Sequence, residues 1–205
     1  MNGRAGLSVK GWVGCGKMAA MDPIETPRLH LRDFIEPDWK ALHEYAKDKE
    51  VVKYLQWGPN SEEQSVNFLR AIIAEHRSAG SKRRNYALAI VMKEEDRLVG
   101  GVRLTVQQPE HRNGDIGYVL RRDHWGRGIV TEAASAILDF GFTKLGLHRI
   151  YATCALANAP SARVLEKIGM KREGQLREHR FEKGEWVTSY LYSILHREWR
   201  EQRQA

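Results

Sequence analysis

The sequence is poor in cysteine and has no long apolar run, and each shortage excludes a class of protein. Only two cysteines occur among 205 residues, Cys15 near the N-terminus and Cys154 in an apolar stretch. We therefore expect neither a disulfide framework nor a metal site, and the low cysteine content fits a reducing, cytoplasmic setting. No apolar run reaches the ~18–20 residues of a membrane helix, so no membrane segment is expected.

The first 23 residues, MNGRAGLSVKGWVGCGKMAAMDP, are rich in glycine and show no hydrophobic periodicity. They lack the continuous apolar stretch of ~7–15 residues that marks a secretory signal peptide. We expect residues 1–23 to form a flexible leader, with Met18 and Met21 as alternative starts. The remainder, residues 24–200, is expected to be a single domain.

Charge and composition narrow the range of partners. Hydrophobic residues make up 42% of the chain, which is enough for a folded core, and the formal net charge is +7. A positive surface favours an anionic partner. No basic helix interleaved with aromatic residues is present, so nucleic acid is not the expected partner. A polyphosphorylated small molecule is therefore the other anionic partner that the positive charge favours.

Hydrophobic periodicity predicts an α/β domain with one mixed sheet of about seven strands and about four helices. Residues 28–34 alternate apolar and charged side chains, as in a half-buried strand. The other expected strands are 85–93, 97–106, 115–120, 148–156, 171–181 and 185–195. Helices are expected after Pro37, after Ser61, from about Arg127 and from about Ala159.

The stretch RDHWGRGIVTE, residues 122–132, places two glycines directly before an expected helix. A tight turn alone would explain Gly126 and Gly128. Alternatively, the N–H groups at the helix start form a phosphate site, with Arg127 adding charge. The motif is not a Walker loop, because the Gly-Lys-Ser/Thr ending is missing. It is not a dinucleotide fingerprint, because it does not open a βαβ unit.

A second strand-to-helix transition lies in NAPSARVLEKIGM, residues 158–170. Asn158 and Ser161 could simply cap the helix. However, neighbouring strand-to-helix transitions place both helix starts at the same sheet edge. One start could then bind phosphates while the other presents Asn and Ser side chains nearby.

These motifs together resemble the GNAT superfamily of N-acetyltransferases. The resemblance is carried by Trp125-Gly126-Arg127-Gly128-Ile129-Val130-Thr131-Glu132, Asn158-x-x-Ser161, Glu25-Thr26-Pro27-Arg28-Leu29, Tyr54-Leu55-x-Trp57-Gly58-Pro59 and Gly184-Glu185-Trp186. It spans residues 25–196, and the branch most similar to the chain contains bacterial enzymes that acetylate ribosomal-protein N-termini. The resemblance implies a sheet that is splayed at the cofactor cleft.

The resemblance implies that acetyl-coenzyme A is the co-substrate and that no metal takes part. Its pyrophosphate would lie on the turn at 126–131, and its pantetheine arm would follow the strand 116–120, with the amide of Val119 stabilising the oxyanion. The implied cofactor-binding residues are Tyr118, Val119, Leu120, Trp125, Gly126, Arg127, Gly128, Ile129, Val130, Thr131, Asn158, Ser161 and Lys167.

The family chemistry is direct acetyl transfer, which requires a base for the amine and an acid for the thiolate. The usual tyrosine acid would fall at Leu165 and is missing here, so Ser161 is the expected acid. Asp115 and Glu178 are the expected bases, although Asp115 could instead be a solvated charge at a strand end. His111 and His179 are weaker candidates. Val130 stands where Gly or Ala is common, but it keeps its N–H donor.

The expected acceptor is the N-terminal α-amino group of a protein or peptide. A small amine such as an antibiotic or a polyamine is the alternative, and a non-catalytic acetyl-coenzyme A sensor is an alternative of another class. The expected substrate-lining residues are Tyr54, Trp57, Arg180 and Trp186, any of whose aromatic rings could instead be core packing. A monomer and a homodimer are both compatible with the sequence.

Overall fold

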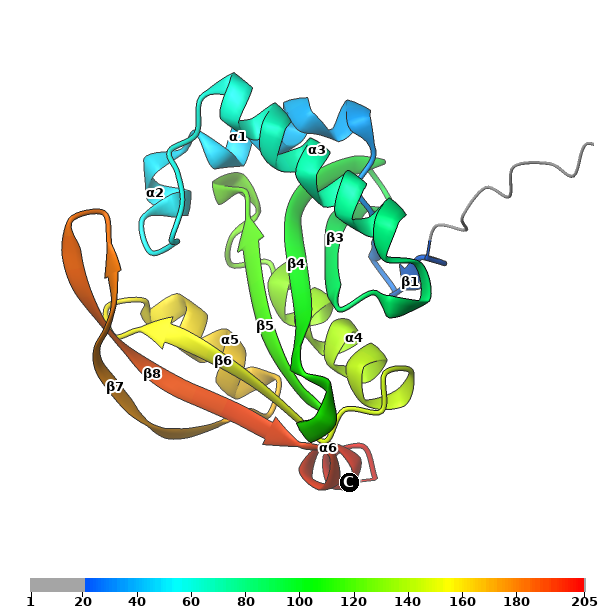
Figure 1. Cartoon of the computed structure of the whole chain (residues 1–205), viewed down its shortest axis with the longest axis vertical. Coiled ribbons are helices and arrows are strands. Elements are labelled where there is room, and N and C mark those ends of the chain that lie inside the picture. Colours follow the sequence, from blue (N-terminus) through cyan, green and yellow to red (C-terminus); the bar gives the residue numbers. More distant parts are fainter. Residues whose placement is uncertain (1–20, 205) are drawn as a thin grey trace, which may run out of the picture.

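A computed structural model describes residues 21–204, and its centre is one mixed sheet (Figure 1). The sheet has eight strands in the order β1-β2-β3-β4-β5-β6-β8-β7, and all neighbours are antiparallel except β5 and β6. The strands are β1 Ile24–Glu25, β2 Leu29–Asp33, β3 Asn85–Met92, β4 Arg97–Gln108, β5 Asn113–Leu120, β6 Arg149–Ala155, β7 Lys171–Glu182 and β8 Glu185–Leu195.

Helices cover both faces of this sheet. Those on the first face are α1 Trp39–Ala46, α2 Lys49–Val52 and α3 Glu62–Ala79, and those on the second are α4 Ile129–Thr143 and α5 Ala159–Lys167. A short α6, His196–Gln202, follows β8. Each face has its own buried cluster: α1 and α3 pack on one, and α4 and α5 on the other.

The mixed α/β class is confirmed. The structure differs from the expected set of elements by an additional short strand and additional short helices. The additional strand is β1, which has two residues, and the additional helices are α2 and α6. Such short elements carry too few residues for a periodic pattern. The helix expected after Ser61 is α3, and a capping box begins it: the Ser61 side chain accepts a hydrogen bond from the Gln64 N–H, and the Gln64 side chain accepts one from the Ser61 N–H.

Most of the expected leader, residues 1–20, lies outside the described residues. Within the described part of the chain, no helix combines the length and the apolar character needed to cross a membrane.

The parallel strands β5 and β6 separate soon after they meet. Only Asn113–Asp115 of β5 pairs with Arg149–Tyr151 of β6, although both strands continue beyond that point. In Figure 1 the two ribbons diverge from the end of the molecule near α6. The splay implied by the resemblance is therefore present, and among residues 21–204 it leaves the rest of β5 without a strand partner on one side.

The start of α4 is fastened to the turn before β2 by one carboxylate. Glu132 accepts hydrogen bonds from the Thr26 hydroxyl at 2.7 Å, the Arg28 backbone N–H at 2.9 Å and the Arg28 Nε at 2.6 Å. Arg28 also donates to the carbonyl oxygen of Arg127 at 3.0 Å. Burial would raise the pKa of Glu132, but these hydrogen bonds together hold it below its ordinary value.

We predict that Glu132→Gln lowers the free energy of unfolding by about 1–2 kcal/mol at neutral pH, because a charged acceptor of several hydrogen bonds is lost. The folded pKa of Glu132 is depressed, so its contribution is present above the unfolded pKa and is lost as pH falls through the folded pKa. The difference from wild type should therefore shrink below about pH 4 in urea unfolding.

Glu62→Gln is the matched control, because Glu62 is an exposed acid in the first turn of α3. Equal destabilisation by the two variants would contradict the role given to the Glu132 contacts.

Candidate active site

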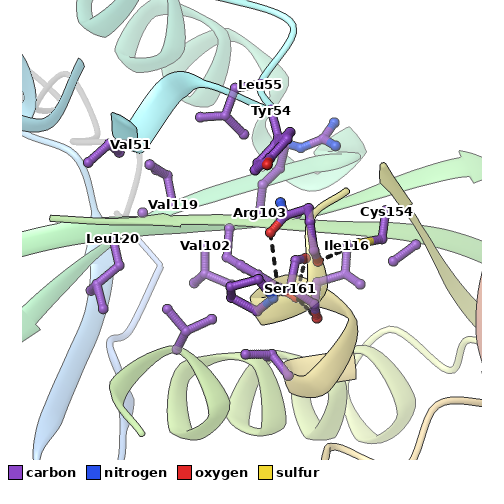
Figure 2. A pocket seen from close by; sticks show the side chains of 18 of the residues that line it. Val51, Tyr54, Leu55, Val102, Arg103, Ile116, Val119, Leu120, Cys154 and Ser161 are labelled. Carbon is purple, nitrogen blue, oxygen red and sulfur yellow. Dashed lines mark hydrogen bonds between the residues drawn. The ribbon is translucent and has the colours of Figure 1, made fainter. Parts of the chain in front are cut away.

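A cavity of about 910 Å³ opens where β5 and β6 diverge. Its walls are formed by β4, β5 and β6, by the first turns of α4 and α5, and by the segment between α2 and α3. Figure 2 shows Tyr54 and Leu55 on one side of the central strand and Ser161 on the other. The cavity therefore reaches both faces of the sheet.

The first turn of α4 presents backbone donors to this cavity. Its N-cap residue, Gly128, has the left-handed angle φ 73 and makes no side-chain cap hydrogen bond. Gly126 is also left-handed, and a Cβ added there would meet no atom within 4 Å. The N–H groups of a helix start have no partner within the helix, so this turn offers amides and a positive dipole end to an anion. The side chain of Val130 packs against the core and leaves its amide in place.

The divergence exposes backbone groups of β5 in an alternating pattern. The Arg121 N–H donates to the Val99 carbonyl oxygen at 2.8 Å, in register with the pair Val119 and Gly101. In an antiparallel ladder alternate residues point their N–H and C=O to the same neighbour. The backbone of Val119 therefore points to β4, and those of Tyr118 and Leu120 point into the gap.

This register corrects the oxyanion role expected for Val119. A Cβ added at Gly100 would meet the carbonyl oxygen of Val119 at 2.3 Å, which places that carbonyl on the β4 side, and in the ladder the N–H and C=O of one residue point the same way. The amide of Val119 is therefore turned away from the gap. Its side chain still lines the cavity, but the gap-facing amides belong to Tyr118 and Leu120.

The start of α5 supports both interpretations of Asn158 and Ser161, as a helix cap and as side chains presented to the cavity. The Asn158 side-chain oxygen accepts the Ser161 N–H at 3.2 Å, so Asn158 is the helix N-cap. The Ser161 hydroxyl remains available to the cavity and lies 2.9 Å from the Tyr118 hydroxyl. Burial raises the pKa of Tyr118, although the Ser161 contact acts to lower it. The Tyr118 phenol is therefore neutral and able to donate across the physiological range.

A carboxylate occupies the other face of the sheet. Asp115 accepts a hydrogen bond from Arg103 at 2.6 Å, and Arg103 reaches it from the neighbouring strand β4. Burial raises the pKa of Asp115 above the ordinary aspartate value, while the charges of Arg103 and Arg180 oppose the shift. A carboxyl group with a raised pKa in a cavity has the property expected of a general base.

Alternation along β5 sets these groups on opposite sides of the sheet. Ile116 and Leu120 belong to the cluster under α4, whereas Val119 packs against the cluster under α1 and α3. Successive side chains of a strand point to opposite faces. Asp115 therefore shares the face of Val119, and Tyr118 shares the face of Ile116. An acid and a base separated in this way can act on the attacking group and on the leaving group of one transfer reaction.

The cavity brings together most of the residues expected from the sequence. Those that line it are Asp115, Tyr118, Val119, Leu120, Trp125, Gly126, Gly128, Ile129, Val130, Thr131, Asn158, Ser161, Lys167, Tyr54, Trp57 and Arg180.

Arg127, Glu178 and Trp186 do not line the cavity. The Arg127 side chain is exposed, and its part in the turn is the carbonyl that binds Arg28. Glu178 lies in a β7 bulge with φ 45 and an exposed side chain. Trp186 is 62% exposed and packs on Phe181 at the hairpin end, with ring centroids 5.3 Å apart.

Sequence reasoning missed Arg103 and Cys154. Arg103 is the charged residue in the apolar run of β4, which is an available signal, but its partner depends on strand register. Cys154 lies on β6 beside the start of α5, and its thiol donates to the Asn158 carbonyl oxygen at 3.4 Å. Burial raises the pKa of this thiol, so it is held neutral.

The side of the cavity that holds Tyr54 and Trp57 is called the acceptor side below. Near it, a hydrogen bond joins two segments that are distant in the sequence. The Lys183 ammonium, at the turn between β7 and β8, donates to the Val52 carbonyl oxygen at 2.7 Å. Trp57 stacks on Phe68 with ring centroids 6.0 Å apart. The β7–β8 hairpin and the segment around α2 thus approach each other (Figure 1).

Comparison with known proteins identifies the same family from three directions. Residues 28–171 match the model of the acetyltransferase (GNAT) domain. The chain is 37% identical over 176 residues to the uncharacterized N-acetyltransferase YnaD of Bacillus subtilis, covering 86% of this chain and 98% of that protein. A crystal structure of a GNAT-family acetyltransferase from Bacillus anthracis has a TM-score of 0.75 and 36% identity, over 85% of this chain and 99% of that one.

A more distant relative carries a named acceptor. The spermidine N(1)-acetyltransferase of Vibrio cholerae is 26% identical to this chain, over 82% of this chain and 93% of that enzyme.

We predict that Gly128→Val weakens the binding of coenzyme A by at least tenfold in calorimetry. A β-branched residue at φ 73 is strained and shifts the amides of the α4 turn. Gly146→Val is the matched control: Gly146 has φ 62, an added Cβ there meets nothing within 4 Å, and it follows the opposite end of α4. Undiminished affinity in the Gly128 variant would rule out the anion site.

Proposed function

Because this chain belongs to the GNAT family and is an N-acetyltransferase, we propose that it moves the acetyl group of acetyl-coenzyme A to the N-terminal α-amino group of a protein or peptide. The observation that carries the proposal is the divergence of β5 and β6 beside the uncapped start of α4. The divergence provides an unpaired backbone edge of β5, and the helix start provides an anion site in the same cavity.

The described residues fit acetyl-coenzyme A at three points. The amides of the α4 turn, with Lys167 on α5, suit the pyrophosphate. The gap-facing backbone groups of Tyr118 and Leu120 suit the amides of the pantetheine arm. The Ser161 hydroxyl, at the start of α5, suits the sulfur. Coenzyme A supplies the thioester carbonyl and a thiolate leaving group.

The residues of the chain then have separate tasks. Asp115 accepts a proton from the attacking amine, directly or through water. The gap-facing amide of Tyr118 stabilises the negative charge that develops on the carbonyl oxygen, while the backbone of Leu120 and the carbonyl of Tyr118 bind the pantetheine arm. Ser161 donates a proton to the sulfur as the carbon–sulfur bond breaks. The opposite faces of the sheet place the base on the side of the attacking amine and the acid on the side of the leaving sulfur.

The pKa of the acceptor favours an α-amine over a polyamine. An α-amino group has a pKa of about 7.7–8.0, so roughly a tenth of it is neutral at pH 7, whereas an alkylamine with a pKa near 10.4 is almost fully protonated. Burial raises the pKa of Asp115, but the contact with Arg103 opposes that rise and limits its strength as a base. Such a base is sufficient for an α-amino group, which loses its proton more readily than an alkylamine.

The charges that line the cavity support the same choice. On the acceptor side Lys53, Arg103 and Arg180 accompany Glu50 and Asp115, which gives an excess of positive charge. A polyamine would require the opposite balance. The motifs shared with the ribosomal-protein branch also support a peptide acceptor. The spermidine enzyme among the relatives supports the small-amine alternative, and the missing tyrosine at Leu165 supports a sensor.

The proposal includes a cytoplasmic setting, which the buried free thiol of Cys154 suits. Either a monomer or a homodimer is compatible with it, because β7 ends the sheet and its outer edge is open to a second copy.

The proposed acceptor is tested by release of free thiol from acetyl-coenzyme A with a panel of amines. We expect turnover with peptides that have a free N-terminus, none with the same peptides N-acetylated beforehand, and at least tenfold lower kcat/KM with spermidine and aminoglycosides. A preference for spermidine would reassign the acceptor. Binding of acetyl-coenzyme A without transfer to any amine would favour the sensor.

We predict that Asp115→Asn lowers kcat/KM by roughly 10²-fold, the usual contribution of a general base. The group is active when deprotonated and its pKa is raised, so the wild-type rate should rise with pH through that pKa and the variant should lack this rise. The pH–rate profile of Glu178→Gln, measured alongside, should match wild type. A loss in that variant instead would move the base to Glu178.

A further inference from the structure

The Tyr118 hydroxyl is placed to serve two acceptors on Ser161. It lies 2.9 Å from the Ser161 Oγ and 3.1 Å from the Ser161 carbonyl oxygen. Tyr118 comes from the middle of β5, and Ser161 from the first turn of α5, which are 43 positions apart in the sequence. Both residues line the cavity between β5 and β6. The contact therefore joins the two walls at the level of the proposed reaction.

Proton counting shows why this contact matters. A serine hydroxyl has one proton, and so does a phenol. If Ser161 donates to Tyr118, its proton is not available for the sulfur. If Tyr118 donates to the Ser161 Oγ, the serine proton is free to turn into the gap. The nearby carbonyl oxygen gives the phenol proton a second acceptor while Ser161 is donating to it.

We propose that Tyr118 is a positioning residue that directs the Ser161 proton to the coenzyme A sulfur; this rests on the proposed function. At rest, Ser161 donates to the Tyr118 oxygen, and Tyr118 donates to the Ser161 carbonyl oxygen. When the sulfur becomes negative, the Tyr118 O–H rotates to the Ser161 Oγ, and the Ser161 O–H turns to the sulfur.

The step balances without a change in the charge of Tyr118. The carbon–sulfur bond breaks and its electron pair stays on sulfur. The sulfur takes the proton of the Ser161 hydroxyl as Ser161 takes one from water, and the hydroxide that is left is neutralised by the proton that Asp115 removed from the amine and releases to solvent. Burial raises the pKa of Tyr118 and keeps it neutral against solvent, and its hydrogen bond stabilises the partial negative charge on the Ser161 oxygen while Ser161 exchanges one proton for another.

A purely structural contact would give a different pattern. If the hydroxyl only tied β5 to α5, its removal would lower stability and leave the acid strength of the site unchanged. Tyr86 is the control for such a role, because its hydroxyl donates to the Arg83 carbonyl oxygen at 3.2 Å outside this cavity. Tyr118→Phe and Tyr86→Phe each remove one hydroxyl from a strand tyrosine that is partly buried.

A double-mutant cycle tests the coupling. We expect Tyr118→Phe and Ser161→Ala each to lower kcat at least tenfold, with KM for acetyl-coenzyme A within about twofold of wild type, and Tyr86→Phe to leave kcat unchanged. The double variant should be no slower than Ser161→Ala within about twofold, because the two hydroxyls act as one unit. Wild-type kcat in Tyr118→Phe, or losses that multiply in the double variant, would overturn the proposal.

A second measurement does not depend on the acceptor. The thiol of bound coenzyme A is titrated by thiolate absorbance, with desulfo-coenzyme A as the blank. We expect the bound thiol to ionise at a lower pH in wild type than in Tyr118→Phe, by about half a pKa unit or more, since the hydroxyl pair stabilises the thiolate. An unchanged titration in that variant would refute the positioning role.

The two measurements separate this inference from the proposed function. A lowered thiol pKa that depends on Tyr118, in a wild-type protein that acetylates no amine, would support the hydroxyl pair and reject acetyl transfer to those amines. Acetyl transfer that is insensitive to Tyr118→Phe would support the proposed function and reject the positioning role.

Discussion

The early separation of β5 from β6 is the constraint on which the rest of the site depends. Three residue pairs hold the strands together, and beyond them β5 keeps its β4 ladder but has no strand on its other side within the described part of the chain. Backbone N–H and C=O groups left in this way need partners. A ligand with amide groups can provide them, so the same break in the sheet makes the cavity and supplies its recognition edge.

The surrounding structure keeps this opening in a fixed shape. Arg28 and Glu132 bind the start of α4 to the turn before β2, and Asn158 caps the start of α5. Side chains therefore hold both helix starts. The contacts of Arg28 and Glu132 point away from the gap between β5 and β6, and the contact of Asn158 runs along α5. The amides of the α4 turn remain available, because the N-cap residue there is a glycine without a side-chain oxygen.

The sheet also divides the chemistry between its two faces. Asp115 lies with Arg103 on the face of α1 and α3, and Ser161 lies with Tyr118 on the face of α4 and α5. A group bound through the gap would meet a proton acceptor on one face and a proton donor on the other. This separation follows from the alternation of side chains along one strand, and it requires no movement of either wall.

The sequence by itself determined the mixed α/β class and the strand-to-helix turns at Gly128 and Asn158, because these depend on local periodicity and short motifs. The grouping of Asp115 and Ser161 in one site followed from the resemblance to the GNAT superfamily. The tertiary structure decided what depends on register. It turned the Val119 amide toward β4, and it placed Glu178 in a bulge where β7 advances four residues from Leu176 to Arg180 while β8 advances two. It also brought Arg103 to Asp115 and Tyr118 to Ser161. A one-residue change in strand pairing turns every side chain of the strand to the other face, and contacts between residues that are distant in the sequence exist only once the strands have paired.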